Sequence, residues 1–234
     1  MFIALAIREL GGCEIFLMTD LWEEWITEYR KRGIEPSRMC RDGVLAPEEY
    51  TSAHPRLLFV MKEVNDLEGG SLQKLLRDGP VHQMWHAVSR WAAGLLNGFP
   101  PFEDIDTYAV IKRSLKKVAS INLKKTSGKA RSNMSVVGAY SFIDRHLLRR
   151  QIQEIGPQLV IACGTWDVLV WLLELEVDPD NPIARPAYSQ LVEAWVLPFR
   201  HPARTNNRVS YDDLKKRVAM LPNNWLQATR YPHA

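Results

Sequence analysis

Residues 56–66 read Arg56-Leu-Leu-Phe-Val-Met-Lys-Glu-Val-Asn-Asp66, and this stretch decides the expected fold. Five consecutive apolar residues, 57–61, are followed at once by charged and amide side chains. An uninterrupted apolar run that ends in polar residues is typical of a strand buried on both faces. In open α/β sheets, functional groups gather beyond the carboxyl ends of such strands. The stretch therefore predicts a core strand with Glu63 at the mouth of a cleft, the alternative being a core strand followed by an ordinary polar loop.

Three further segments predict strands, and helical patterns separate them. The expected strands are 56–61, 118–123, 159–164 and 194–197. Helices are expected at 20–32, 71–77, 81–96, 104–116, 135–154, 165–175 and 211–221, and loops at 34–55, 124–133 and 177–189. This alternation predicts an α/β fold, a three-layer α/β/α arrangement with a central, mostly parallel four-stranded sheet. We expect one domain over residues 18–221, an N-terminal extension at 1–17 and a loosely attached tail at 222–234.

Composition narrows the class of protein. The chain has 234 residues, of which 46% are hydrophobic and 24% charged, as in ordinary soluble domains. Its three cysteines are far apart and form no Cys-x-x-Cys pair, which argues against a disulfide framework and indicates a reducing, cytoplasmic compartment. The apolar run at the start of the chain is too short to span a bilayer. His82 and His86 have a spacing that could bind a metal, but no third ligand accompanies them, so we expect no metal and no cofactor.

Positive charge is concentrated in one part of the chain. The net charge is only +3, yet no acidic residue occurs between Asp106 and Asp144. That interval contains a series of basic residues: Lys112, Arg113, Lys116, Lys117, Lys124, Lys125, Lys129 and Arg131. Clustered basic residues on a balanced chain favour a surface that follows phosphates, whereas an ordinary solvated face usually mixes both signs. We therefore expect a polyanionic partner.

The order of the polar motifs resembles the uracil-DNA glycosylase superfamily over residues 56–221. In that superfamily the first core strand is followed by Gly-Gln-Asp-Pro-Tyr, Gly-Glu-Ala-Pro-Gly or Gly-Met-Asn-Pro-Gly, and Met61-Lys-Glu-Val-Asn65 occupies this place. Residues 118–123 resemble the strand whose asparagine reads the flipped base, which points to Asn122. Residues 159–164 resemble the Leu-Ile-Ile-Ala-Leu-Gly strand. His201-Pro-Ala-Arg204 resembles the His-Pro-Ser motif, whose histidine contacts the base O2.

The first motif departs from the family pattern. It lacks both the glycine and the proline, and the four-cysteine iron–sulfur pattern of some branches is missing. In one register Glu63 matches the residue that handles the attacking water, and Asn65 matches a tyrosine that excludes bases with a substituent at carbon 5. A smaller polar residue there implies that a 5-substituted pyrimidine is accepted, as in some modified phage DNA, which would suit a role in antiviral defence.

Breaking an N-glycosidic bond leaves positive charge on the sugar and negative charge on the base, so the resemblance implies distinct roles for the polar residues. Glu63, with Asp66 as a substitute, would stabilise the cation or activate water. His201 would stabilise the base anion, and Asn122 would read the Watson–Crick edge with its amide donor and acceptor. The remaining candidates would hold DNA once the base is flipped out: Lys124, Lys125, Lys129, Arg131, Arg204 and Thr205.

The sequence thus predicts a monomeric, monofunctional DNA glycosylase that acts on a modified pyrimidine rather than plain uracil. Two alternatives stay open. One is a catalytically inactive module of the same fold that binds modified DNA or a protein partner. The other is an α/β hydrolase that processes nucleotides and does not bind duplex DNA.

Overall fold

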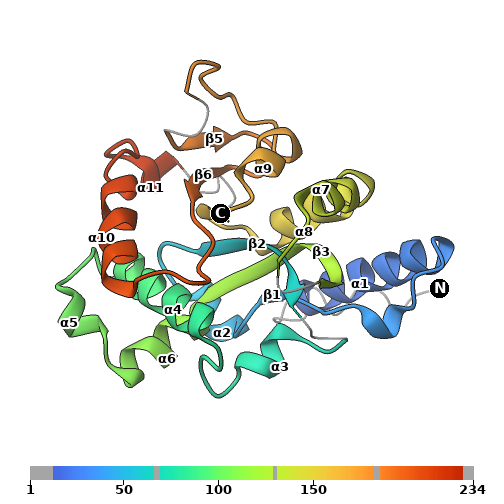
Figure 1. Cartoon of the computed structure of the whole chain (residues 1–234), viewed down its shortest axis with the longest axis horizontal. Coiled ribbons are helices and arrows are strands. Elements are labelled where there is room, and N and C mark those ends of the chain that lie inside the picture. Colours follow the sequence, from blue (N-terminus) through green and yellow to red (C-terminus); the bar gives the residue numbers. More distant parts are fainter. Residues whose placement is uncertain (1–12, 66–68, 129–130, 182–184, 229–234) are drawn as a thin grey trace.

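The fold is built around a mixed six-stranded sheet, seen here in a computed structural model that describes residues 13–65, 69–128, 131–181 and 185–228 (Figure 1). The strands lie in the order β1-β3-β2-β4-β6-β5. Their bounds are β1 (Gly43–Val44), β2 (Leu57–Asn65), β3 (Val118–Gly128), β4 (Leu159–Cys163), β5 (Ala187–Ser189) and β6 (Ala194–Phe199).

The four inner strands are parallel, and they are the four strands that the apolar runs predict. Strand β2 pairs in parallel with β3 on one side and β4 on the other, and β4 pairs in parallel with β6. The edge strands β1 and β5 are antiparallel to their neighbours. The expected sheet of four strands was therefore too small. Both edge strands fall in segments expected to be loops, because strands of two and three residues leave no periodic pattern in the sequence.

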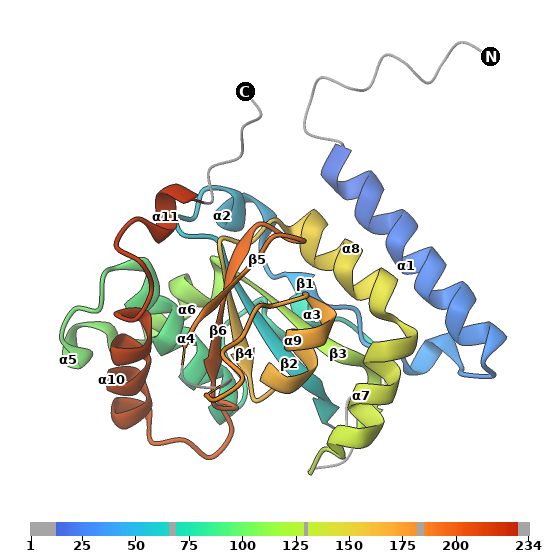
Figure 2. The same cartoon turned by 90° about the horizontal axis from the view of Figure 1, so that it is seen from above.

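Helices cover both faces of the sheet (Figure 2). One face is covered by α1 (Cys13–Lys31), α7 (Met134–Ile143), α8 (Arg145–Ile155) and α9 (Trp166–Leu172), and the other by α4 (Gln83–Leu96), α6 (Tyr108–Lys116) and α10 (Asn207–Val218). Shorter elements complete the chain: η1 (Pro36–Arg38), α2 (Pro47–Thr51), α3 (Leu72–Leu76), α5 (Phe102–Ile105) and α11 (Trp225–Ala228). This arrangement is compatible with the three layers expected.

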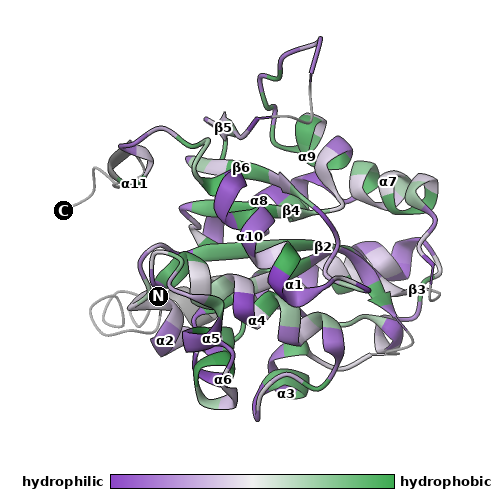
Figure 3. Cartoon of the chain, turned by 60° about the vertical axis from the view of Figure 1, so that its left-hand side comes forward, coloured by the Kyte–Doolittle hydropathy of each residue, from purple (hydrophilic) through white to green (hydrophobic). Residues whose placement is uncertain are grey.

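Alternating residues of the central strands point into two separate cores. On β2, Leu58 and Val60 join the core under α1 and α8, while Leu57 and Phe59 join the core under α4 and α10. Burial on both faces explains why these strands read as continuous apolar runs. In Figure 3 β2 and β4 are green along much of their length, whereas purple marks the polar stretches of the surrounding helices.

Two inner strands extend further than the sequence predicted. Strand β2 continues through Lys62 and Glu63, so Glu63 lies in the strand and not in a loop. Strand β3 continues to Gly128, so the expected loop at 124–133 was wrong for its first part. Alternation along β3 puts Lys125 on the same face as Ile121 and Leu123, where a buried carboxylate compensates its charge.

Two helical segments also differ from expectation. The segment 135–154 is two helices that meet at Asp144, a residue only 1% exposed. Its carboxylate accepts hydrogen bonds from the Tyr29 hydroxyl at 3.1 Å and the Arg32 guanidinium at 2.6 Å, which fixes the corner against α1. Helix α1 begins at Cys13, before the start expected near residue 20. Among the described helices, none is both long and apolar enough to cross a membrane.

Candidate functional site

The carboxyl ends of the four parallel strands lie at one edge of the sheet, and Lys62 and Glu63 belong to the last four residues of β2 there. Successive side chains of a strand point to opposite faces. Lys62 and Glu63 therefore lie on opposite faces of β2, whose neighbours are β3 and β4. Glu63 contacts β3, and Lys62 contacts the residues that follow β4 and β6. This edge therefore carries two polar clusters.

The first cluster is the ion pair between Glu63 and Lys124. The Lys124 Nζ lies 2.6 Å from Glu63 Oε2, and the two side chains are only 7% and 6% exposed. Lys124 also donates to the carbonyl oxygens of Thr126 and Ser127, at 3.2 and 2.9 Å. A β-carbon built on Gly128 would lie 2.0 Å from the Glu63 carboxyl carbon, so the strand end covers this carboxylate tightly. Glu63 is at the expected edge, but it is paired and largely enclosed.

Asn122 lies on β3 opposite Met61, two positions before Lys124, and is 3% exposed. Its backbone N–H and its side-chain Nδ2 both donate to Oδ2 of Asp42, at 2.8 and 3.2 Å. The other carboxylate oxygen of Asp42 accepts from Lys125 and from Gln151. Because a carboxylate only accepts hydrogen bonds, it fixes the amide of Asn122 with its nitrogen toward Asp42.

Lys125 belongs to this buried network and not to a DNA-binding surface. Its side chain is fully buried, and its Nζ lies 2.8 Å from Asp42 Oδ1 and 4.6 Å from the centre of the Trp25 ring. Burial lowers the pKa of Lys125, and the carboxylate of Asp42 opposes that shift. The prediction that Lys124 and Lys125 grip a DNA strand is therefore wrong for this conformation, because both ammonium groups are enclosed and paired.

The second cluster contains Lys62, Gly164 and His201. Gly164 follows β4 with a φ of +67°, and its N–H donates to the Phe199 carbonyl oxygen at 2.8 Å, which joins the ends of β4 and β6. A β-carbon built on Gly164 would lie 3.1 Å from Lys62 Cε, 3.4 Å from Lys62 Nζ and 3.5 Å from His201 Cβ. The absence of a side chain at Gly164 thus lets Lys62 and His201 approach the same point.

His201 is held as a neutral imidazole with a donor at Nε2. Burial, with a further effect from the charge of Lys62, lowers the pKa of His201 to about 4. The backbone N–H of Ala203 donates to His201 Nδ1 at 3.2 Å. A neutral imidazole that accepts at Nδ1 carries its proton on Nε2. The side chain can therefore donate from Nε2 to an acceptor such as a carbonyl oxygen.

The predicted site residues are only partly brought together. Glu63 and Asn122 lie on neighbouring strands, whereas the described contacts of His201 involve the Lys62 and Gly164 side of the edge. Asn65 is exposed at the end of β2 and pairs in register with Gly128. Arg131 and Arg204 are exposed, and the Thr205 hydroxyl donates to the Pro202 carbonyl oxygen at 3.0 Å. Asp66 and Lys129 lie outside the described residues.

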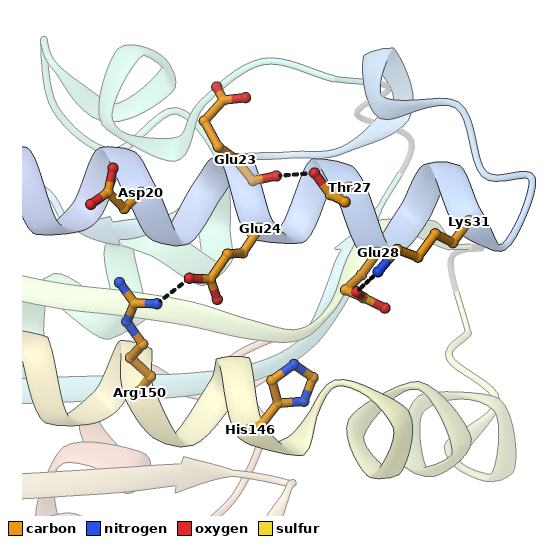
Figure 4. A pocket seen from close by; sticks show the side chains of 8 residues that line it. All are labelled: Asp20, Glu23, Glu24, Thr27, Glu28, Lys31, His146 and Arg150. Carbon is orange, nitrogen blue, oxygen red and sulfur yellow. Dashed lines mark hydrogen bonds and ion pairs between the residues drawn. The ribbon is translucent and has the colours of Figure 1, made fainter.

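Two cavities are lined by residues that belong to neither cluster. One, of about 600 Å³, lies between α1 and α8 and is lined by Asp20, Glu23, Glu24, Thr27, Glu28, Lys31, His146 and Arg150 (Figure 4). Arg150 and Lys31 already pair with Glu24 and Glu28 there. The other has a volume of about 430 Å³, and the residues that line it include Trp22, Met39 and Arg41. Among the described residues, no group of three or more His, Cys, Asp or Glu side chains is arranged to hold a metal ion.

Sequence reasoning missed two residues that shape this edge. Lys62 belongs to the stretch 56–66 and directly follows the apolar run 57–61. That position could have indicated a functional side chain at the end of the strand. Asp42 offered no signal, because its partners Asn122, Lys125 and Gln151 are 80 or more positions away along the chain. Comparison with known proteins gives no further guidance, since neither a family model nor a curated protein matches the sequence.

Proposed function

We propose that this protein is a monofunctional DNA glycosylase that hydrolyses the N-glycosidic bond of a flipped pyrimidine. The observation that carries the proposal is the donor geometry of His201 at the carboxyl edge of the parallel strands. An imidazole held neutral, with Nδ1 accepting from Ala203 N–H and no contact to Nε2–H among the described residues, can stabilise negative charge on a base oxygen as that charge develops. The motif order that resembles the uracil-DNA glycosylases supports the same assignment, with a monomeric, cytoplasmic enzyme as the accompanying prediction.

Glu63 is the candidate for the positive side of the reaction. As the bond to the base breaks, the sugar gains positive charge, which a nearby carboxylate stabilises. Lys124 and Gly128 enclose Glu63 in the described conformation. The proposed reaction therefore requires the strand end around Gly128 to shift when DNA binds, so that the carboxylate reaches the sugar or an attacking water.

Asn122 is the candidate for reading the base edge. Because Asp42 holds the amide nitrogen, Oδ1 is the atom left to accept a hydrogen bond. Such an acceptor suits a ring N–H of a uracil-like base or the exocyclic amino group of a cytosine-like base. Asn65, exposed at the end of β2, is consistent with a substituent at carbon 5 of the base.

A second candidate function is an inactive module of the same fold that binds modified DNA. The enclosure of Glu63 favours this alternative, because the carboxylate is paired at 2.6 Å with Lys124 and its side chain is only 6% exposed in this conformation. The two functions share a binding site for a flipped base and differ only in bond cleavage.

One experiment separates these functions. Duplexes that each carry one modified pyrimidine are incubated with the protein, and abasic sites are revealed by alkaline strand scission. The enzyme predicts scission with at least one 5-substituted base and a weaker reaction with plain uracil. Glu63→Gln should abolish scission and keep DNA binding, while Glu23→Gln, an exposed change on α1, should leave both intact. Binding without scission in the unchanged protein would instead support the inactive module.

A further inference from the structure

The ammonium group of Lys62 has no counter-ion among the described residues of the site. Lys62 is half-buried at the end of β2, and the described hydrogen bonds and ion pairs do not involve its Nζ. The two enclosed lysines of the neighbouring strand β3 are both neutralised, since Lys124 pairs with Glu63 and Lys125 with Asp42. A half-buried cation that no described carboxylate neutralises attracts an anion, and a ligand can supply that anion.

The surroundings of Lys62 define where that anion would be. The side chain crosses Gly164, with Nζ 3.4 Å from the point where a β-carbon would be, and His201 Cβ is 3.5 Å from the same point. The charge of Lys62 also acts on His201 and helps to lower its pKa. The Lys62 ammonium group and the His201 side chain thus start from one position at Gly164, and an oxygen that gains negative charge beside them is within reach of both.

We propose that Lys62 stabilises the departing pyrimidine as an anion, together with His201. This inference rests on the proposed glycosylase function and adds a residue to it. When the bond between C1′ and the base nitrogen breaks, the electron pair leaves with the base and spreads onto its carbonyl oxygens. Water adds to C1′ and releases a proton to solvent, and Lys62 stays protonated throughout. Lys62 therefore acts by charge and forms no covalent intermediate.

The leaving group provides a sharp test. Single-turnover rates are measured on duplexes whose pyrimidines carry substituents at carbon 5 that range from electron-withdrawing halogens to methyl. A base that holds negative charge poorly depends most on an external cation. Lys62→Met should therefore slow the poorest leaving groups by about 100-fold and the best by less than about 10-fold, and so steepen the dependence of rate on base acidity. Lys62→Arg, which keeps the charge, should restore the shallow dependence.

Controls separate the possible failures. Lys215→Met, an exposed change on α10, should leave rates and slope unchanged. An NMR titration of His201 checks the geometry without activity, because removal of the Lys62 charge should raise the pKa of His201 above about 4. An active enzyme whose slope is the same with Met at position 62 overturns the role of Lys62 alone. A wild-type protein that cleaves none of these bases overturns the proposed function, and this inference with it.

Discussion

At the scale of single residues, Gly128 controls the environment of Glu63. A β-carbon at Gly128 would lie 2.0 Å from the Glu63 carboxyl carbon and 2.2 Å from Oε2, the atom that pairs with Lys124. Gly128→Ala should therefore push the carboxylate off Lys124 and lower the free energy of unfolding by about 1–3 kcal/mol. Urea denaturation measures this change.

The matched control for this substitution is Gly138→Ala on α7. A β-carbon at Gly138 meets no atom within 4 Å, so the change adds only helix propensity. It should raise the free energy of unfolding by up to about 1 kcal/mol. Equal effects of the two substitutions would show that Gly128 does not press on Glu63 in solution.

His201 makes stability depend on pH in a defined window. Its pKa is about 4 in the folded protein against an ordinary value of 6.5, so the unfolded chain binds more protons between these values. The stability that the neutral ring contributes to the folded state is fully present above pH 6.5 and is lost as the pH falls toward 4. Unfolding free energies at pH 4.5 and 7 should thus differ more in the wild type than in His201→Asn. Replacing the exposed His146 by Asn should leave the wild-type difference in place.

Residue-scale prediction from the sequence succeeded in locating polar groups and failed in pairing them. Glu63, Asn122 and His201 were each placed at or beyond the end of a core strand. His201 follows β6 and Glu63 lies near the end of β2, but Asn122 lies in the middle of β3. Their partners Lys124, Asp42 and Lys62 were not assigned, because hydrogen bonds across 61 or 80 positions depend on the register of strands. Asp42 occupies a segment with no apolar period, and only the pairing of β1 with β3 brings it to Asn122.

At the scale of elements, β3 owes its length to the compensation of Lys125. Without Asp42, Gln151 and the Trp25 ring, an ammonium group at that position would not be tolerated in the core. Lys125→Met should leave the Asp42 carboxylate without its cation and lower the free energy of unfolding by about 3–5 kcal/mol. Lys215→Met, an exposed change on α10, should alter it by less than about 0.5 kcal/mol.

A double variant tests whether the charge is the cause. Adding Asp42→Asn to Lys125→Met removes the uncompensated carboxylate and should recover part of the lost stability, as denaturation curves of the single and double variants will show. Additive losses would mean that Lys125 stabilises β3 by packing against Trp25 and not by its pairing with Asp42.

The sequence predicts strands well where consecutive residues are apolar and buried. It predicts them poorly where buried polar residues interrupt the apolar run. The apolar runs locate the starts of β2, β3, β4 and β6 within a residue or so. The last five residues of β3 escaped prediction because two lysines in succession are typical of a loop. The corner at Asp144 escaped because the bonds that fix it come from α1, more than 100 positions earlier.

At the scale of the whole molecule, the fold divides a basic segment that is continuous in sequence. Helix α6 carries Lys112, Arg113 and Lys116 and ends just before β3, at the amino edge of the parallel strands. The 11 residues of β3 then span about 35 Å, with Lys124 and Lys125 enclosed. Arg131 lies beyond the carboxyl end, on the same edge as Arg204 after β6. The run of basic residues in the sequence therefore predicted a larger basic surface for a polyanion than the fold exposes.

This division makes a prediction about DNA binding under the proposed function. The pair Arg131→Ala and Arg204→Ala removes two exposed charges from the carboxyl edge, where the flipped base would enter. Affinity should fall, and the slope of log affinity against log salt should decrease by about two, because each lost phosphate contact removes roughly one released counter-ion. The matched pair Arg113→Ala and Lys116→Ala removes two charges from the amino edge and should leave the slope unchanged. Fluorescence anisotropy with one labelled duplex at several salt concentrations measures both, and a larger effect of the α6 pair would put the DNA on the opposite edge from His201 and Glu63.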